Sequence, residues 1–135
     1  GRDASNRRAR EGAFVLRRAL QWGKQPLDLW WSLEAKNAFC MRRADLPRFY
    51  PGMQVGQEGL ESTMVHHADL LILTVEFPRK FWPKVYAKCL DQNSQRINLD
   101  PGTVIQSDRI AGRYSMIVRR PVVGFKYGLW WDIPN

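Results

Sequence analysis

Hydrophobic and polar positions follow two different patterns along the chain, and the change falls near residue 45. From Asp3 to Met41 helix-forming residues predominate, and a Gly and Pro break separates a first helix from a second one predicted over Leu27–Cys40. From Asp45 onward, short apolar or β-branched runs alternate with turn residues, which predicts strands. A chain of 135 residues suits a single compact domain. We therefore expect a basic helical extension over residues 1–44 and one β domain over residues 45–135.

The β domain is expected to be a small antiparallel barrel. In Lys84–Leu90 the apolar Val85, Ala87 and Cys89 alternate with Lys84, Tyr86 and Lys88, which predicts one buried face and one basic face. Turns are predicted at Asp91–Ser94 and at Asp100–Gly102, where Pro and Gly favour reversal of the chain. The other predicted strands are Leu70–Phe77, Thr103–Gln106, Tyr114–Arg119 and Val122–Trp131. Because many short strands are stabilised by closure, the pattern predicts a barrel, making the chain mainly β.

Charge narrows the classes of partner. The chain has 21 Lys and Arg against 13 Asp and Glu, a net charge of +8, which favours contact with a polyanion, RNA or DNA ahead of anionic lipid. The alternative is a basic soluble protein with no such partner. No apolar run approaches the roughly 18 residues needed to span a bilayer, so we expect no membrane insertion. The two cysteines, Cys40 and Cys89, have no metal-ligand spacing and are expected to be reduced and buried.

Arginines mark the segments expected to contact RNA. Six arginines lie between Arg2 and Arg18 against two acids, which is typical of an RNA-contacting arm but also of an ordinary solvated helix. Arg119 and Arg120 precede Pro121, which we expect to let both side chains turn outward. The residues predicted to contact RNA are Arg7, Arg8, Arg10, Arg17, Arg18, Arg113, Arg119, Arg120 and Lys126. Tyr50, Trp82 and Tyr127 are candidates for stacking on bases, although core packing is the more common use of such rings.

Several segments together resemble one protein family. Leu46–Val55 reads Leu-Pro-Arg-Phe-Tyr-Pro-Gly-Met-Gln-Val and resembles the Pro-x-Phe-x-Pro-Gly-Asp-x-Val signature of the bacterial-type large-subunit ribosomal proteins of the L-nineteen family. Phe81–Leu90 resembles that family's second strand, and Tyr114–Arg120 its Thr-Phe-Thr-Val-Arg-Lys strand. Gly124–Trp131 resembles its Gly-Val-Gly-Val-Glu-x-x-Phe strand, and Ile133–Asn135 its closing turn.

The departures from that family are those expected of a divergent organellar version. Met53 replaces the acid after Pro-Gly, Lys126 replaces a glycine, and Gly128 replaces a glutamate. The segments Gly56–Asp69 and Gln92–Gly112 are longer than in bacterial members. The resemblance implies an SH3-like barrel and a structural protein of the large ribosomal subunit. It further implies contacts with rRNA and neighbouring ribosomal proteins near the subunit interface, in the mitochondrial matrix.

Catalysis finds little support in the sequence. His66 and His67 are adjacent, so they would leave opposite faces of a strand and could not form one dyad or metal site. Glu58 and Glu61 lie between glycines and a serine, which indicates an exposed loop. There is no phosphate-binding Gly-rich loop and no nucleophile elbow. We expect no enzyme activity, no cofactor and no metal.

Two other classes of function fit the same composition. A non-catalytic accessory subunit of an organellar membrane complex, such as a respiratory assembly, would place its tryptophans at a protein or lipid interface. A protein–protein adaptor would use the barrel as a peptide platform. Sedimentation with ribosomal subunits after detergent treatment separates the ribosomal function from the membrane one.

Overall fold

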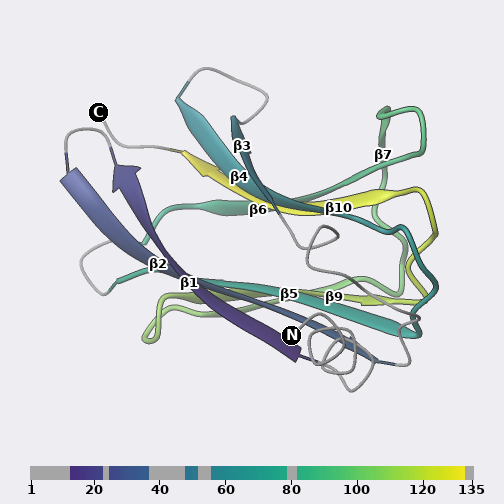
Figure 1. The fold of residues 1–135 in the computed structure, drawn as a ribbon, viewed down its shortest axis with the longest axis horizontal. Coiled ribbons are helices and arrows are strands. Elements are labelled where there is room, and N and C mark those ends of the chain that lie inside the picture. The colour runs from purple at the N-terminus through teal and green to yellow at the C-terminus, as the bar shows by residue number, and fades with distance from the viewer. Residues whose placement is uncertain (1–12, 23–24, 37–47, 52–55, 79–81, 133–135) are drawn as a thin grey trace, which may run out of the picture.

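The part of the chain that the structure describes forms two antiparallel sheets of five strands each, stacked face to face (Figure 1). The computed structural model describes residues 13–22, 25–36, 48–51, 56–78 and 82–132, with side chains over 31–35, 56–78 and 82–132. The strands are β1 (Ala13–Trp22), β2 (Gln25–Lys36), β3 (Arg48–Pro51), β4 (Gln57–Thr63), β5 (Leu70–Glu76), β6 (Val85–Leu90), β7 (Arg96–Ile97), β8 (Val104–Asp108), β9 (Arg113–Arg119) and β10 (Lys126–Asp132). None of these described residues is helical, so none of their elements is a helix that could cross a membrane.

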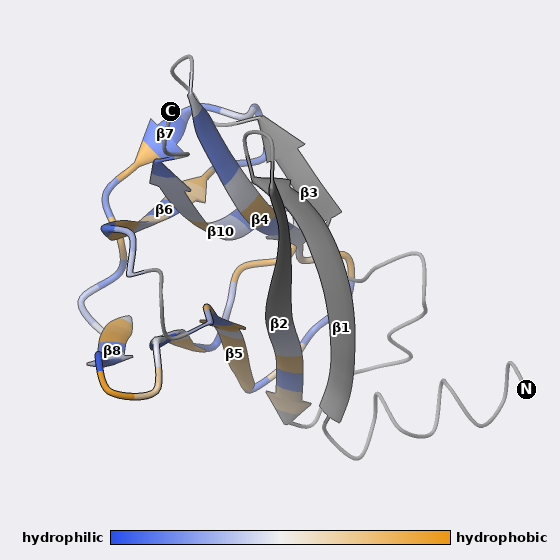
Figure 2. Cartoon of the chain, turned by 90° about the vertical axis from the view of Figure 1, so that its left-hand side faces the viewer, coloured by the Kyte–Doolittle hydropathy of each residue, from blue (hydrophilic) through white to orange (hydrophobic). Residues whose placement is uncertain are grey.

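Strand order shows how the two layers are connected. Sheet A has the order β1-β2-β5-β9-β8 and forms the lower layer of Figure 1, and sheet B has the order β3-β4-β10-β6-β7 and forms the upper one. The view turned by 90° shows the same two layers, with β5 and β8 below β6 and β10 (Figure 2). The links β4 to β5, β5 to β6 and β9 to β10 each pass from one sheet to the other. The prediction of a mainly β chain is therefore confirmed. The predicted barrel is wrong, because the strands form two separate sheets instead of one closed one.

The core lies between the sheets and follows from the alternation of residues along each strand. In β5 the side chains of Leu71, Leu73 and Val75 are buried, and the residues between them face outward. Leu73 is paired in register with Leu33 of β2 and Met116 of β9, so one apolar row crosses sheet A. From sheet B the inward residues include Leu60, Tyr127, Leu129 and Trp131. The Phe77 and Trp131 rings meet edge to face, with their centroids 5.1 Å apart.

The helix expected over Leu27–Cys40 is wrong for its larger part, which is strand β2. Trp31, Leu33 and Ala35 are buried, whereas Ser32 is half-buried and Glu34 exposed, so the apolar positions repeat every two residues. Over residues 13–22 the first expected helix is replaced by β1, whose ten residues all pair with β2, and the earlier part of that helix lies outside the described residues. Because β2 also pairs with β5, the segment expected to be an extension shares one sheet with the later strands.

The later strands and turns agree well with the sequence pattern. The strands predicted at Leu70–Phe77, Lys84–Leu90, Thr103–Gln106 and Tyr114–Arg119 correspond to β5, β6, β8 and β9. The last predicted strand begins four residues late, at Lys126, because the Phe125 backbone N–H donates to the Val122 carbonyl in a turn, 3.1 Å. Both predicted turns are confirmed, and each is closed by bonds from backbone N–H groups to an aspartate, Asp91 in one and Asp100 in the other.

One loop prediction fails. The segment from Gly56 to Ser62 was expected to be an exposed loop, but Gln57–Thr63 forms β4, with β3 on one side and β10 on the other. Leu60 and Ser62 face the core, and Gly59 is buried opposite Trp130. Glycine and serine are used here because they leave room for the large rings of β10, rather than because the chain turns.

Candidate nucleic-acid interface

Two cations converge on one tryptophan on the outer face of sheet B. The Lys88 Nζ lies 4.6 Å from the centroid of the Trp130 ring, and the Arg96 guanidinium carbon lies 5.1 Å from the same centroid. Both distances are within the range of cation–π attraction. Trp130 points away from the core, yet only 5 % of it is exposed. The Trp130 ring therefore contacts two positively charged side chains, Lys88 from β6 and Arg96 from β7.

A glycine in β10 lets Lys88 lie across the sheet. In register, Gly128 stands between Lys88 of β6 and Glu61 of β4, and it has no side chain to separate them. The Lys88 Nζ comes within 3.6 Å of the Glu61 carboxylate. Lys88 is consequently buried although it is on the outer face, whereas Glu61, with which it forms the ion pair, is partly exposed.

The surroundings of Lys88 hold more positive than negative charge. Burial lowers the pKa of the Lys88 ammonium, Glu61 opposes this, and the nearby charges of Arg96 and Lys126 lower the pKa further. Lys126 also donates from Nζ to the Ser94 hydroxyl, 2.9 Å. Arg96 and Lys126 thus lie close enough to repel the Lys88 ammonium, and an incoming anion would relieve this repulsion.

Lys84 extends the positive surface along β6. Its Nζ lies 5.4 Å from the Tyr86 ring centroid, and Tyr86 in turn lies beside Trp130 with 6.5 Å between their centroids. We call the residues Lys84, Tyr86, Lys88, Arg96, Lys126 and Trp130 the basic face of sheet B. Asp132 lies at its far end, where its carboxylate accepts a hydrogen bond from the Gln57 amide, 3.0 Å.

The predicted RNA-contacting residues do not form one cluster. Arg113 and Arg119 are at opposite ends of β9, about 20 Å apart along the strand, and Lys126 belongs to the other sheet. Arg113 pairs loosely with Glu76, 3.9 Å. Arg119 and Arg120 are both exposed, as expected, because Arg120 adopts a left-handed backbone (φ 49°) before Pro121. Arg7, Arg8 and Arg10 lie outside the described residues, and Arg17 and Arg18 are on β1, whose side chains are not described.

Sequence reasoning left Lys84, Lys88 and Arg96 out of the predicted contacts. The alternation along Lys84–Leu90 did indicate a basic face, and that signal is confirmed on β6. Nothing local in the sequence, however, places Arg96 or Trp130 beside Lys88, because these residues come from three strands. Of the candidate stacking rings with described side chains, Tyr127 is in the core, where its hydroxyl accepts a bond from the Val122 N–H, and Trp82 is exposed.

Cysteine and histidine residues contribute no metal cluster in the described part of the chain. No group of three or more His, Cys, Asp or Glu residues there is placed to hold an ion. Cys89 is a free, buried thiol beside Tyr127, and burial raises the pKa of both groups. His67 lies 3.2 Å from the Asp69 carboxylate on the exposed link between β4 and β5.

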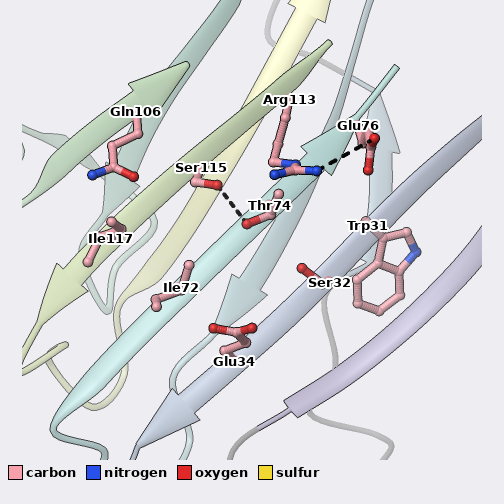
Figure 3. A pocket seen from close by; sticks show the side chains of 10 residues that line it. All are labelled: Trp31, Ser32, Glu34, Ile72, Thr74, Glu76, Gln106, Arg113, Ser115 and Ile117. Atoms are coloured by element: carbon pink, nitrogen blue, oxygen red, sulfur yellow. Dashed lines mark hydrogen bonds and ion pairs between the residues drawn. The ribbon is translucent and has the colours of Figure 1, made fainter. Parts of the chain in front are cut away.

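The outer face of sheet A carries a groove of different character. Its cavity volume is about 410 Å³, and side chains from β2, β5, β8 and β9 line it (Figure 3). The lining residues are Trp31, Ser32, Glu34, Ile72, Thr74, Glu76, Gln106, Arg113, Ser115 and Ile117. Carboxylates outnumber cations here, in contrast to the basic face of sheet B.

No protein-family model, curated protein or solved structure matches this chain.

Proposed function

We propose that the chain is a non-catalytic RNA-binding protein that contacts the phosphate backbone through the basic face of sheet B. The observation that carries this proposal is the convergence of Lys88 and Arg96 on Trp130, with Lys126 close by. The Lys88 ammonium pairs with the Glu61 carboxylate, and the exposed Arg96 and Lys84 add positive charge that a ligand can reach. The net charge of +8 favours the same class of partner.

Phosphate is the part of RNA that this face suits best. Trp130 is covered by cations, so its ring does not offer a free surface on which a base could stack. Arg96 and Lys84 are exposed and can pair with backbone oxygens, and a phosphate would raise the lowered pKa of Lys88. Binding should therefore depend weakly on sequence and strongly on salt.

The test is the salt dependence of binding to a fluorescently labelled oligouridylate, followed by fluorescence anisotropy. Replacing both Arg96 and Lys126 with Ala should weaken binding and flatten the plot of log K against log salt by about 0.7 per lost contact. The matched control is Arg113→Ala, which removes an exposed arginine from sheet A and should leave the slope unchanged.

Two results contradict the proposal. One is an unchanged salt slope in the Arg96→Ala/Lys126→Ala protein, with its thermal midpoint preserved. The other is a larger effect of Arg113→Ala, or of Arg119→Ala/Arg120→Ala, than of the sheet B variant. The first result would remove the RNA contact from sheet B, and the second would move it to β9 and the residue that follows it.

Membership of the large ribosomal subunit stays a prediction and is narrower than RNA binding. The resembling segments do fall on strands β3, β6, β9 and β10, but these belong to two sheets instead of one barrel. Cosedimentation with large subunits after detergent treatment tests it. Recovery with a membrane complex would favour the accessory-subunit alternative.

A further inference from the structure

The groove on sheet A is built from three parallel rows of side chains that cross the strands. The middle row is polar and uncharged: Ser32, Thr74, Ser115 and Gln106 are successive partners in register on β2, β5, β9 and β8. The Thr74 and Ser115 hydroxyls are hydrogen-bonded to each other, 2.8 Å. In Figure 3 these two side chains lie side by side at the centre of the groove.

The rows on either side differ from each other. One contains Glu34 on β2, followed in register by Ile72 and Ile117, so it is apolar over most of its length. The other contains the ion pair of Glu76 and Arg113. A ligand that fits must therefore present hydrogen-bonding groups along its middle and one edge, and C–H groups along the other edge.

We propose that this groove binds a neutral oligosaccharide. Sugar hydroxyls both donate and accept, as do the serine and threonine hydroxyls and the glutamine amide of the middle row. Glu76 and Arg113 can make charge-assisted bonds to hydroxyls, and the C–H face of a sugar ring can pack on Ile72 and Ile117.

Size and charge agree with this ligand class. Four strands span about 14 Å, which is the length of a few linked sugars, and a volume of about 410 Å³ is in the range of ligand sites. Among the described side chains that line the groove, Glu34 and Glu76 outnumber the cation Arg113, which disfavours anionic ligands. The groove and the basic face of sheet B thus lie on opposite outer faces and select different chemistry.

The experiment is a titration of the isotopically labelled full chain with three neutral probes, cellohexaose, xylohexaose and laminarihexaose, observed by amide NMR. At least one probe should shift the amides of Ser32, Thr74, Gln106 and Ser115 while leaving Lys88 and Trp130 unchanged. Gln106→Ala should weaken that binding by about tenfold, because Gln106 is exposed and lines the groove without supporting the core. Thr63→Val, an exposed residue at the end of β4, is the matched control and should bind as the wild type does.

Three results with the neutral sugars overturn the inference. They are the absence of shifts with all three probes at millimolar concentration, shifts located on sheet B, and equal binding by the Gln106→Ala protein. A shift of the groove amides by oligouridylate instead of the neutral sugars would also overturn it, since the groove would then hold a polyanion. None of the three results with neutral sugars bears on RNA binding by sheet B, whereas the result with oligouridylate would also count against that proposal.

Discussion

The Lys88 ammonium lies 4.6 Å from the Trp130 ring centroid and 3.6 Å from the Glu61 carboxylate. It lies above Gly128 of sheet B, which has no side chain to occupy this space. A ring and an acid therefore hold a buried cation on the outer face of a sheet. The arrangement brings positive charge next to Arg96 and Lys126, and several consequences can be measured.

The first prediction concerns the pH dependence of stability. Because the folded-state pKa of Lys88 is lowered below its ordinary 10.5, the unfolded chain holds this proton more tightly. The contribution of Lys88 to the free energy of unfolding is greatest above pH 10.5 and is lost as the pH falls through the lowered pKa. Relative to Lys88→Met, the wild type should therefore gain free energy of unfolding as the pH rises from 7 toward 10.5.

Urea denaturation of both proteins at several pH values measures this difference. The comparison cancels other groups, such as Tyr127, that titrate in the same range. A difference in free energy that is constant with pH would contradict the lowered pKa of Lys88.

The second prediction concerns Gly112, which joins β8 to β9. Its φ is +66°, and a Cβ would lie 2.5 Å from the Phe77 carbonyl oxygen, while the Phe77 N–H donates to the Gly112 carbonyl. Gly112→Ala should lower the free energy of unfolding by about 3 kcal/mol. Gly102→Ala is the control, since its Cβ would meet only the Asp100 side chain at 3.5 Å, and should cost less than about 1 kcal/mol. Equal effects of the two substitutions in chemical denaturation would refute the steric argument.

The third prediction concerns a buried hydroxyl. Ser62 is 1 % exposed, and its Oγ has no hydrogen-bond partner within the described structure. Ser62→Ala removes the unsatisfied group with little change in volume and should stabilise the fold by about 1 kcal/mol. Ser115→Ala, which breaks the bond to Thr74, should destabilise the fold by a similar amount. Thermal unfolding of both variants checks the opposite signs, and a loss of stability in Ser62→Ala would show that its hydroxyl is bonded.

The fourth prediction concerns the thiol of Cys89. The thiol is buried and its pKa is raised, so little reactive thiolate forms at neutral pH. In a Cys40→Ser background, Cys89 should react with a disulfide reagent much more slowly in buffer than in urea. Equal rates in the two conditions would mean that β6 and β10 open readily around this position.

The sequence could predict individual strands but not how they pair. The alternation in β5, β6 and β9 is clear because each strand has one face on the core. In β2 the adjacent Trp30 and Trp31 obscure the same two-residue period, and the good helix formers around them favour the wrong structure. Local sequence also does not show whether the strands close into a barrel. Here β1 and β2 add two strands to sheet A that the barrel prediction did not contain.

The candidate site was predictable only in part for a related reason. A basic alternation marks Lys84 and Lys88, but their environment depends on Trp130, forty-two residues beyond Lys88 in the sequence. The conspicuous arginines, Arg119 and Arg120, lie instead where β9 ends and the chain turns toward sheet B. Density of charge in the sequence therefore did not indicate where the proposed contact lies.

The most direct test of the account is hydrogen exchange of the full chain with and without oligouridylate at low salt. RNA binding through sheet B predicts slower exchange over residues 84–97 and 126–130, and unchanged exchange over residues 72–76 and 113–119 on sheet A. Protection confined to residues 113–120, or no protection in any described segment, would contradict it.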